Sequence, residues 1–122
     1  MTDRSFAFTK QHRLLDASQY KAVFDKASWK VSNKEWLFLA RKNQLDHARL
    51  GLVIAKKHVR LSVQRNRLKR LTRESFRLQP DNLAGIDIIV LCRKGADLKT
   101  NPETFTDLNN LWRKLARHVQ SR

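Results

Sequence analysis

The chain has 122 residues, of which 41% are hydrophobic and 30% charged, with only three glycines and two prolines. This is the composition of one globular domain, and it excludes collagen, low-complexity chains and extensive disorder. The single cysteine excludes an intramolecular disulfide framework and a zinc site built from several cysteines. Lys and Arg number 26 against 11 Asp and Glu, so the net charge is +15. That charge indicates a polyanionic partner, with nucleic acid first and an anionic membrane surface second.

Residues 1–13 predict a flexible, basic N-terminal arm, because they carry four basic residues without hydrophobic periodicity. The arm lacks the apolar stretch of a secretory signal. The longest uncharged apolar run, 88–92, is also too short to span a bilayer. We therefore expect a cytoplasmic protein that does not span a membrane, with residues 14–119 forming one nucleic-acid-binding domain.

A first helix is predicted over about 17–27. Asp16 stands at the N-cap position, with Gln19 three residues later to complete a capping box. Tyr20 and Phe24 lie one turn apart on the same side of this helix. They either belong to the core or offer stacking faces to the bases of a single strand.

Short apolar runs predict the strands. The runs 36–40 and 50–55 flank a turn-like segment, NQLD, and predict an antiparallel hairpin, with an extra short strand near Val31. The run 86–92 is nearly continuously apolar, as in a strand buried on both faces. A helix separates 50–55 from 86–92, so this unit is a crossover and the sheet is predicted to be mixed.

The most basic segment predicts a helix from Ser62 to about Leu78, ending before Pro80. On a helical wheel, five polar residues share one face about 100° wide: Asn66, Lys69, Arg70, Arg73 and Arg77. The opposite side is apolar and is expected to pack on the sheet: Leu68, Leu71, Phe76 and Leu78. Cations crowded on one face repel each other. This face therefore predicts phosphate binding, for which Arg forks are suited, and a merely solvated face is the alternative.

The last helix is predicted to begin with Asn101 as the cap and Pro102 in the first turn. Its apolar stripe runs to Val119 and includes Phe105 and Trp112, which we expect in the core.

Catalytic and metal-binding patterns are not found in the sequence. The carboxylates are not clustered as in a two-metal nuclease. Cys92 ends a buried strand and is expected to be a small core residue. Four histidines are scattered without the spacing of a metal site: His12, His47, His58 and His118. We therefore expect no catalytic residue and no metal ligand in the protein.

The segment RNRLKR (65–70), followed by Arg73 and Phe76, resembles the RNR signature of the protein subunit of bacterial ribonuclease P. The upstream GLVIAKK (51–57) resembles that family's strand and double-lysine element. Arg13, Leu14 and Leu15 with Ser18, Tyr20 and Phe24 resemble its first helix, and DIIV (87–90) with RKG (93–95) its last strand. The resemblance covers about residues 6–118.

The resemblance implies an α+β fold: an α-β sandwich with a mixed four-stranded sheet and a left-handed βαβ crossover, related to a ribosomal-protein domain. It also implies a ribonucleoprotein endoribonuclease that removes 5′ leaders from precursor tRNA. In this family the RNA subunit performs the hydrolysis, and the Mg²⁺ ions are bound mainly by that RNA. The partners implied are the catalytic RNA and the leader, without an obligate protein partner.

Two sets of site residues follow by position from the resemblance. The first set would contact the catalytic RNA: Arg65, Asn66, Arg67, Lys69, Arg70, Arg73 and Arg77. The second would line a central cleft for the leader: Tyr20, Phe24, Phe38, Lys56, Lys57 and Lys94. In the segment WLFL (36–39), either alternate pair could face this cleft. The competing function is that of a non-enzymatic ribosomal protein, which charge and fold alone would permit.

Overall fold

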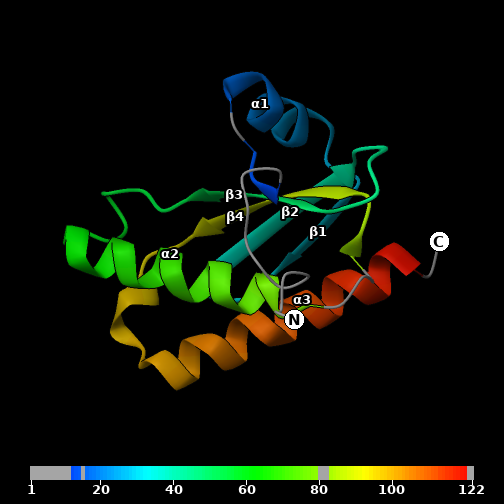
Figure 1. Ribbon diagram of the computed structural model, residues 1–122. Helices are drawn as coiled ribbons and strands as arrows, with labels where there is room; N and C mark the ends of the chain where they lie inside the picture. The colour runs from blue at the N-terminus through cyan, green and yellow to red at the C-terminus, as the bar shows by residue number, and fades with distance from the viewer. Residues whose placement is uncertain (1–11, 15, 80–82, 121–122) are drawn as a thin grey trace, which may run out of the picture.

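The structure is a computed structural model that describes residues 12–14, 16–79 and 83–120. Four strands form one sheet in the order β1-β2-β4-β3; they are β1 (Trp29–Ser32), β2 (Trp36–Lys42), β3 (Arg49–Val53) and β4 (Ile86–Cys92). The helices are α1 (Ala17–Lys26), α2 (Ser62–Arg77) and α3 (Asn101–Gln120), with a short 3₁₀ helix, η4 (Ala96–Leu98). Helix α1 covers one face of the sheet, and α2 and α3 cover the other (Figure 1). The predicted mixed sheet and α+β class are confirmed.

The predicted hairpin between the second and third strands is wrong, because β4 lies between them. It pairs antiparallel with β2, opposing Cys92 to Trp36, and parallel with β3, opposing Asp87 to Arg49. Strand β4 is buried along almost its whole length. An apolar strand of this kind is most stable at the centre of a sheet, where both of its faces are covered. The chain therefore reaches β4 from β3 by a crossover through α2. The extra strand near Val31 is confirmed as β1, paired with β2.

The larger core lies between the sheet and the helices α2 and α3. Trp112 of α3 is fully buried in it, with ring centroids 4.5 Å from Phe38 and 5.5 Å from Phe76. The Trp112 indole Nε1–H donates to Ser75 Oγ at 2.8 Å, so its polar atom is satisfied. The predicted core position of Trp112 is confirmed, whereas Phe105 is only half-buried.

A smaller core lies on the opposite side of the sheet, beneath α1. Leu14, Val23 and Ile89 are buried there. Partly buried side chains surround these three: Tyr20, Leu39, Val53 and Leu91. This sheet surface, together with α1, is called the α1 face below.

The helix caps explain where α1 and α3 begin. Asp16 caps α1 as predicted, because its Oδ1 accepts a hydrogen bond from Gln19 N at 3.0 Å. The bond from the Ser18 hydroxyl, followed by this cap bond, lowers the pKa of Asp16. The cap of α3 is not Asn101 but Thr100. Thr100 N donates to Glu103 Oε1 at 2.9 Å, and Glu103 N donates to Thr100 Oγ1 at 3.3 Å, which forms a reciprocal capping box.

The N-terminal segment joins the edge of the sheet just before α1. Residues 1–11 of the predicted arm lie outside the described residues. Arg13 forms a parallel bridge with Leu50 of β3, and Leu14 N donates to Leu50 O at 3.0 Å. The arm prediction therefore does not hold for Arg13, which is held by this bridge. Among the helices of the described residues, none is long and apolar enough to cross a bilayer.

Candidate nucleic-acid interface

Helix α2 presents a polar outer surface because its apolar residues hold the other side against the sheet. Leu68 is fully buried and Phe76 nearly so. Leu71 is half-buried, as the predicted stripe requires, but Leu78 is exposed because it lies beyond the last helical turn. Four polar residues on the outer side have side chains that form no hydrogen bond or ion pair with any described residue: Asn66, Lys69, Arg70 and Arg73. We call these four the α2 cation face.

The other three residues predicted to contact RNA have partners within the protein. Arg65 Nη1 donates to the carbonyl oxygens of Val59 at 3.0 Å and Arg60 at 2.8 Å, so it holds the segment before α2. Arg77 pairs with Glu74 at 2.6 Å, and this hydrogen bond lowers the pKa of Glu74. The two Arg65 bonds leave further donors of its guanidinium unused, since each guanidinium carries five N–H groups.

Arg67 links α2 to the start of α3. Its Nη1 donates to Asn101 Oδ1 at 2.7 Å, and its Nη2 donates to the Asp97 carbonyl oxygen at 3.3 Å. The side chain of Asn101 is available for this bond because Thr100, and not Asn101, caps the helix. Within the RNR segment, the central Asn66 is exposed, whereas both arginines are bonded to neighbouring segments of the chain.

The two aromatic residues of α1 differ in exposure. Phe24 is 45% exposed. Tyr20 is half-buried, and its ring lies directly against Gly51 of β3. The sequence left a core position and a stacking position open for this pair. The structure leaves Phe24 accessible on the α1 face, whereas Tyr20 is largely engaged with the sheet.

The prediction that Phe38 lines the leader cleft is wrong. Phe38 is 0% exposed and lies in the larger core against Trp112, on the far side of the sheet from α1. Trp36 points the same way, so the alternation of side chains directs Leu37 and Leu39 to the α1 face. The core between the sheet and helices α2 and α3 is the larger of the two cores, and it contains the aromatic rings of both Trp36 and Phe38.

The lysines predicted for the cleft gather at one edge of the sheet. Lys56 and Lys57 follow β3, and Lys94 follows β4; all three are exposed. Because β3 and β4 are parallel neighbours, their carboxyl ends lie at the same edge. None of the three lysines forms an ion pair with another residue that the structure describes. This edge is therefore strongly basic.

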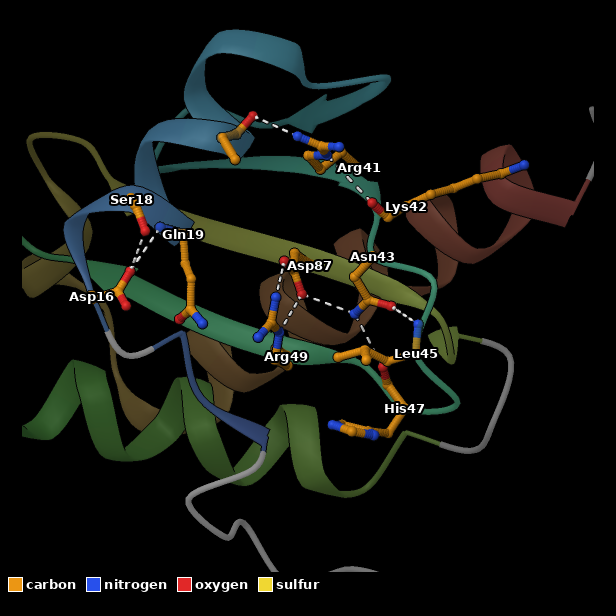
Figure 2. A network of polar contacts seen from close by, with 11 residues as sticks. Asp16, Ser18, Gln19, Arg41, Lys42, Asn43, Leu45, His47, Arg49 and Asp87 are labelled. Carbon is orange, nitrogen blue, oxygen red and sulfur yellow. Dashed lines mark hydrogen bonds and ion pairs between the residues drawn. The ribbon is translucent and has the colours of Figure 1, made fainter.

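A polar network beneath α1 joins three strands (Figure 2). Arg49 donates through Nε and Nη2 to the two carboxylate oxygens of Asp87, at 2.8 and 2.7 Å, and this bonding raises the pKa of Arg49. Asn43 Nδ2 donates to Asp87 Oδ1 at 2.8 Å. Arg41 Nη1 reaches the Ala22 carbonyl oxygen of α1 at 3.4 Å. The buried Asp87 is thus neutralised by its neighbours and holds β2, β3 and β4 in register.

The remaining acidic and nucleophilic groups suit structural roles. Lys99 bridges Asp107 at 2.8 Å and Glu35 at 3.2 Å, and the bond to Asp107, with a smaller contribution from Glu35, raises the pKa of Lys99. Burial raises the pKa of the Cys92 thiol to about 12, so it is a poor nucleophile at neutral pH. Among the described residues, no three His, Cys, Asp or Glu side chains are grouped so that they could hold a metal ion. The geometry supports binding of a polyanion.

Sequence comparison identifies close relatives. The family model for Ribonuclease P matches residues 8–116. The ribonuclease P protein component of Pseudomonas fluorescens (strain Pf0-1) is 55% identical over 111 residues, which cover 91% of this chain and 84% of that protein. That of Ectopseudomonas mendocina (strain ymp) is 54% identical over 118 residues, which cover 97% of this chain and 88% of the relative.

Solved structures show the same fold. The Staphylococcus aureus RNase P protein superposes with a TM-score of 0.78 at 27% identity, covering 84% of this chain and 94% of that one. The Thermotoga maritima RNase P protein gives a TM-score of 0.73 at 31% identity, covering 86% and 96%. These matches support the ribonuclease P resemblance and not the ribosomal-protein alternative. The chain belongs to the family of bacterial ribonuclease P protein subunits.

Proposed function

We propose that this protein assists RNA-catalysed removal of the 5′ leader from precursor tRNA by binding both the catalytic RNA and the leader. The RNA subunit performs the hydrolysis in this proposal. One observation carries it: the α2 cation face holds three cations and Asn66 on a rigid, well-packed helix, without a partner among the described residues. Family membership supports the RNA as the partner that such a surface fits.

The α2 cation face is suited to phosphate groups for electrostatic reasons. Lys69, Arg70 and Arg73 share one side of a helix, where like charges destabilise each other by a few tenths of a kcal/mol per pair. Bound phosphates turn this repulsion into attraction, and Arg forks add paired hydrogen bonds. Arg65 and Arg67 flank this surface and can add contacts through their unused donors, and Arg77 lies at its end. We therefore place the catalytic RNA along α2.

The leader is placed on the α1 face, beside Phe24. An exposed aromatic ring can stack on an unpaired base of any identity, which suits an enzyme with many precursor substrates. Lys56, Lys57 and Lys94 at the basic edge would attract the leader phosphates. Leu37 and Leu39, rather than Phe38, supply the β2 side chains of this surface.

The Mg²⁺ ions of the reaction are assigned mainly to the RNA subunit. Asp87, Asp107 and Glu35 are each bound to a cation, and the carboxylates of the described residues do not form a cluster that fits a metal. The protein's positive charge would instead reduce repulsion between the two RNAs and so lower the Mg²⁺ concentration that they require. The reaction is placed in the cytoplasm, without an obligate protein partner or a membrane.

The proposal is tested by cleavage of precursor tRNA with the cognate RNA subunit at low Mg²⁺, with and without the protein. Cleavage should depend on the protein at low Mg²⁺ and proceed with RNA alone at high Mg²⁺. The matched control is the double variant R70A/R73A, which retains the buried side of α2. It should fold normally and fail to stimulate cleavage at protein concentrations where the wild type saturates. Equal stimulation by both proteins would contradict the assignment of α2.

A further inference from the structure

The start of α1 is attached to the outer edge of β3 by an extension of the sheet. Leu14 N donates to Leu50 O at 3.0 Å on this edge. The next outward-facing donor of β3 is the N–H of Leu52, two residues along. The Tyr20 hydroxyl oxygen accepts from it at 3.3 Å. The phenol of Tyr20 therefore stands where the carbonyl oxygen of an added strand would otherwise be, and it closes the ladder.

Gly51 provides the space that the Tyr20 ring needs. A Cβ atom on Gly51 would lie 2.8 Å from Tyr20 Cε2 and Cζ and 2.9 Å from Tyr20 Oη, closer than real contacts allow. Positive φ angles occur at Gly85 and Gly95 but not at Gly51. The glycine is thus required by the close approach of the ring and not by the backbone conformation. Any larger residue here would displace the Tyr20 ring from its place against β3.

Helix α1 has few other attachments to the sheet. It is ten residues long, and Val23 is its one buried residue. An isolated helix of this length is marginal in water, so its position depends on the tertiary contacts that it makes. The bond from Arg41 to the Ala22 carbonyl, at 3.4 Å, is long. Tyr20 and Val23 therefore determine where α1 lies on the sheet.

We propose that Tyr20 is a positioning residue for leader binding, and that Gly51 is the position that receives it. The ring on Gly51 and the hydroxyl on Leu52 fix α1, and this places Phe24, one turn later, where it can stack on the leader. Because the Tyr20 ring lies against Gly51 and its hydroxyl is bonded to Leu52, we assign the stacking contact with the leader to Phe24. This inference rests on the proposed leader site.

The first test measures the attachment itself in the full-length protein. Tyr20→Phe keeps the ring but removes the acceptor of the Leu52 N–H. Amide hydrogen exchange of Leu52 should then accelerate by roughly 2- to 10-fold, the value of one net hydrogen bond. Amides of α2 should not change, and Phe24→Ala should leave Leu52 unaffected. Unchanged exchange of Leu52 in Tyr20→Phe would overturn the inference.

The second test measures the affinity of the holoenzyme for precursor and for mature tRNA in the variants Gly51→Ala, Tyr20→Ala and the double variant. Gly51→Ala should lower the precursor-to-mature affinity ratio by about tenfold, within the range of one base–aromatic stack. In the double variant, Gly51→Ala should not lower this ratio below that of Tyr20→Ala alone. Affinity for the RNA subunit should be unchanged, because α2 lies on the opposite side of the sheet. Tyr20→Phe, the mildest change, should lower the ratio in the same direction.

The outcomes separate the inference from the function on which it rests. If Phe24→Ala leaves the precursor-to-mature ratio unchanged, the proposed leader site is wrong. If Phe24→Ala lowers the ratio but the losses from Gly51→Ala and Tyr20→Ala add up, then Tyr20 contacts the leader directly and is not a positioning residue. Non-additive losses together with faster Leu52 exchange support the proposal.

Discussion

Arg67 and Arg73 lie on the same helix, yet their guanidinium groups have different surroundings. Arg67 is bonded to Asn101 and Asp97, whereas Arg73 is exposed and makes no polar contact with the described residues. We predict that Arg73→Ala weakens binding to the RNA subunit by about 1–3 kcal/mol, as for a charge-assisted bond. The slope of log K against log salt should become shallower by up to about one unit. Titrations over a series of salt concentrations measure both effects.

Arg67→Ala is the matched control for this prediction. It removes the same charge but also breaks bonds that join α2 to the start of α3. Its melting temperature should fall, while that of Arg73→Ala should stay at the wild-type value. A wild-type salt slope for Arg73→Ala would mean that Arg73 does not contact the RNA.

Cys92 gives a prediction that depends on pH. Burial, with a smaller contribution from Asp97, raises the pKa of its thiol to about 12. A folded-state pKa above the unfolded value of about 8.5 means that the protonated thiol's contribution to stability is complete below pH 8.5 and is lost as pH rises toward 12. At pH 8 the thiol should therefore react with a disulfide reagent only as fast as the protein unfolds. Since Cys92 is the single cysteine, the signal is unambiguous; rapid reaction of the native protein would disprove the burial.

At the residue scale, the sequence predicted chemical types better than the direction of individual side chains. In WLFL (36–39) every residue is apolar. Strand geometry requires the side chains to alternate between the two faces, but four apolar residues do not show which pair faces α1. The position of Phe38 is decided by Trp112, which is distant in sequence. The cap of α3 was placed one residue late because both Thr100 and Asn101 can cap a helix. Glu103, three residues after Thr100, was the signal that distinguishes them.

Helix α1 contains an adjacent pair of residues with opposite environments. Val23 is fully buried, whereas Phe24 is 45% exposed. We predict that Phe24→Ala weakens precursor tRNA binding by up to about 3 kcal/mol, the upper value of one stacking contact, and leaves mature tRNA binding nearly unchanged. A thermal melt combined with binding of both tRNAs to the holoenzyme measures this.

Val23→Ala provides the comparison within α1. It should lower the free energy of unfolding by about 1.5–3 kcal/mol, the value of a buried valine. A drop in melting temperature for Phe24→Ala, without a change in discrimination between the two tRNAs, would mean that Phe24 acts in the core and that the leader does not bind at α1.

Helix α2 supports a second comparison between its two sides. Leu68 is fully buried beneath the helix, so Leu68→Ala should cost roughly 2–5 kcal/mol of stability through the cavity that it leaves. The salt dependence of RNA binding should keep its wild-type slope, because no phosphate contact is removed. Denaturant unfolding and salt titration together test this. A shallower slope for Leu68→Ala would mean that the helix loses its cation face when it repacks.

At the element scale, local signals were sufficient for boundaries but not for strand pairing. The predicted spans of α2 and β4 agree with the structure, because an amphipathic helix has its own period and a continuous apolar run has clear ends. The hairpin was wrong because NQLD looked like a turn between neighbouring strands. The pairing depends on β4, more than 30 residues later, which is apolar enough to occupy the centre. Contacts of that range leave no local trace in the sequence.

For the molecule as a whole, the distribution of charge matters more than its sum. Several of the acids are bound to Arg or Lys within the protein: Asp25, Glu35, Glu74, Asp87 and Asp107. The cations of the α2 cation face and of the basic edge are left to act outward. In the proposed function, the α2 cation face would direct positive charge to the catalytic RNA, and the basic edge would direct it to the leader on the α1 face. Such an arrangement would bring two polyanions together, as the proposed division of labour requires.

This distribution predicts how carboxylate substitutions affect cleavage. Asp87→Asn, Glu74→Gln and Asp107→Asn should each leave cleavage of precursor tRNA intact at high Mg²⁺ and saturating protein. Asp87→Asn should be the least stable of the three, because it leaves the half-buried Arg49 without its counter-charge. Single-turnover assays, with a melt of each variant, separate loss of folding from loss of chemistry. If one of these variants folds and binds the RNA but no longer supports cleavage, then the protein supplies a catalytic group and the division of labour proposed here is wrong.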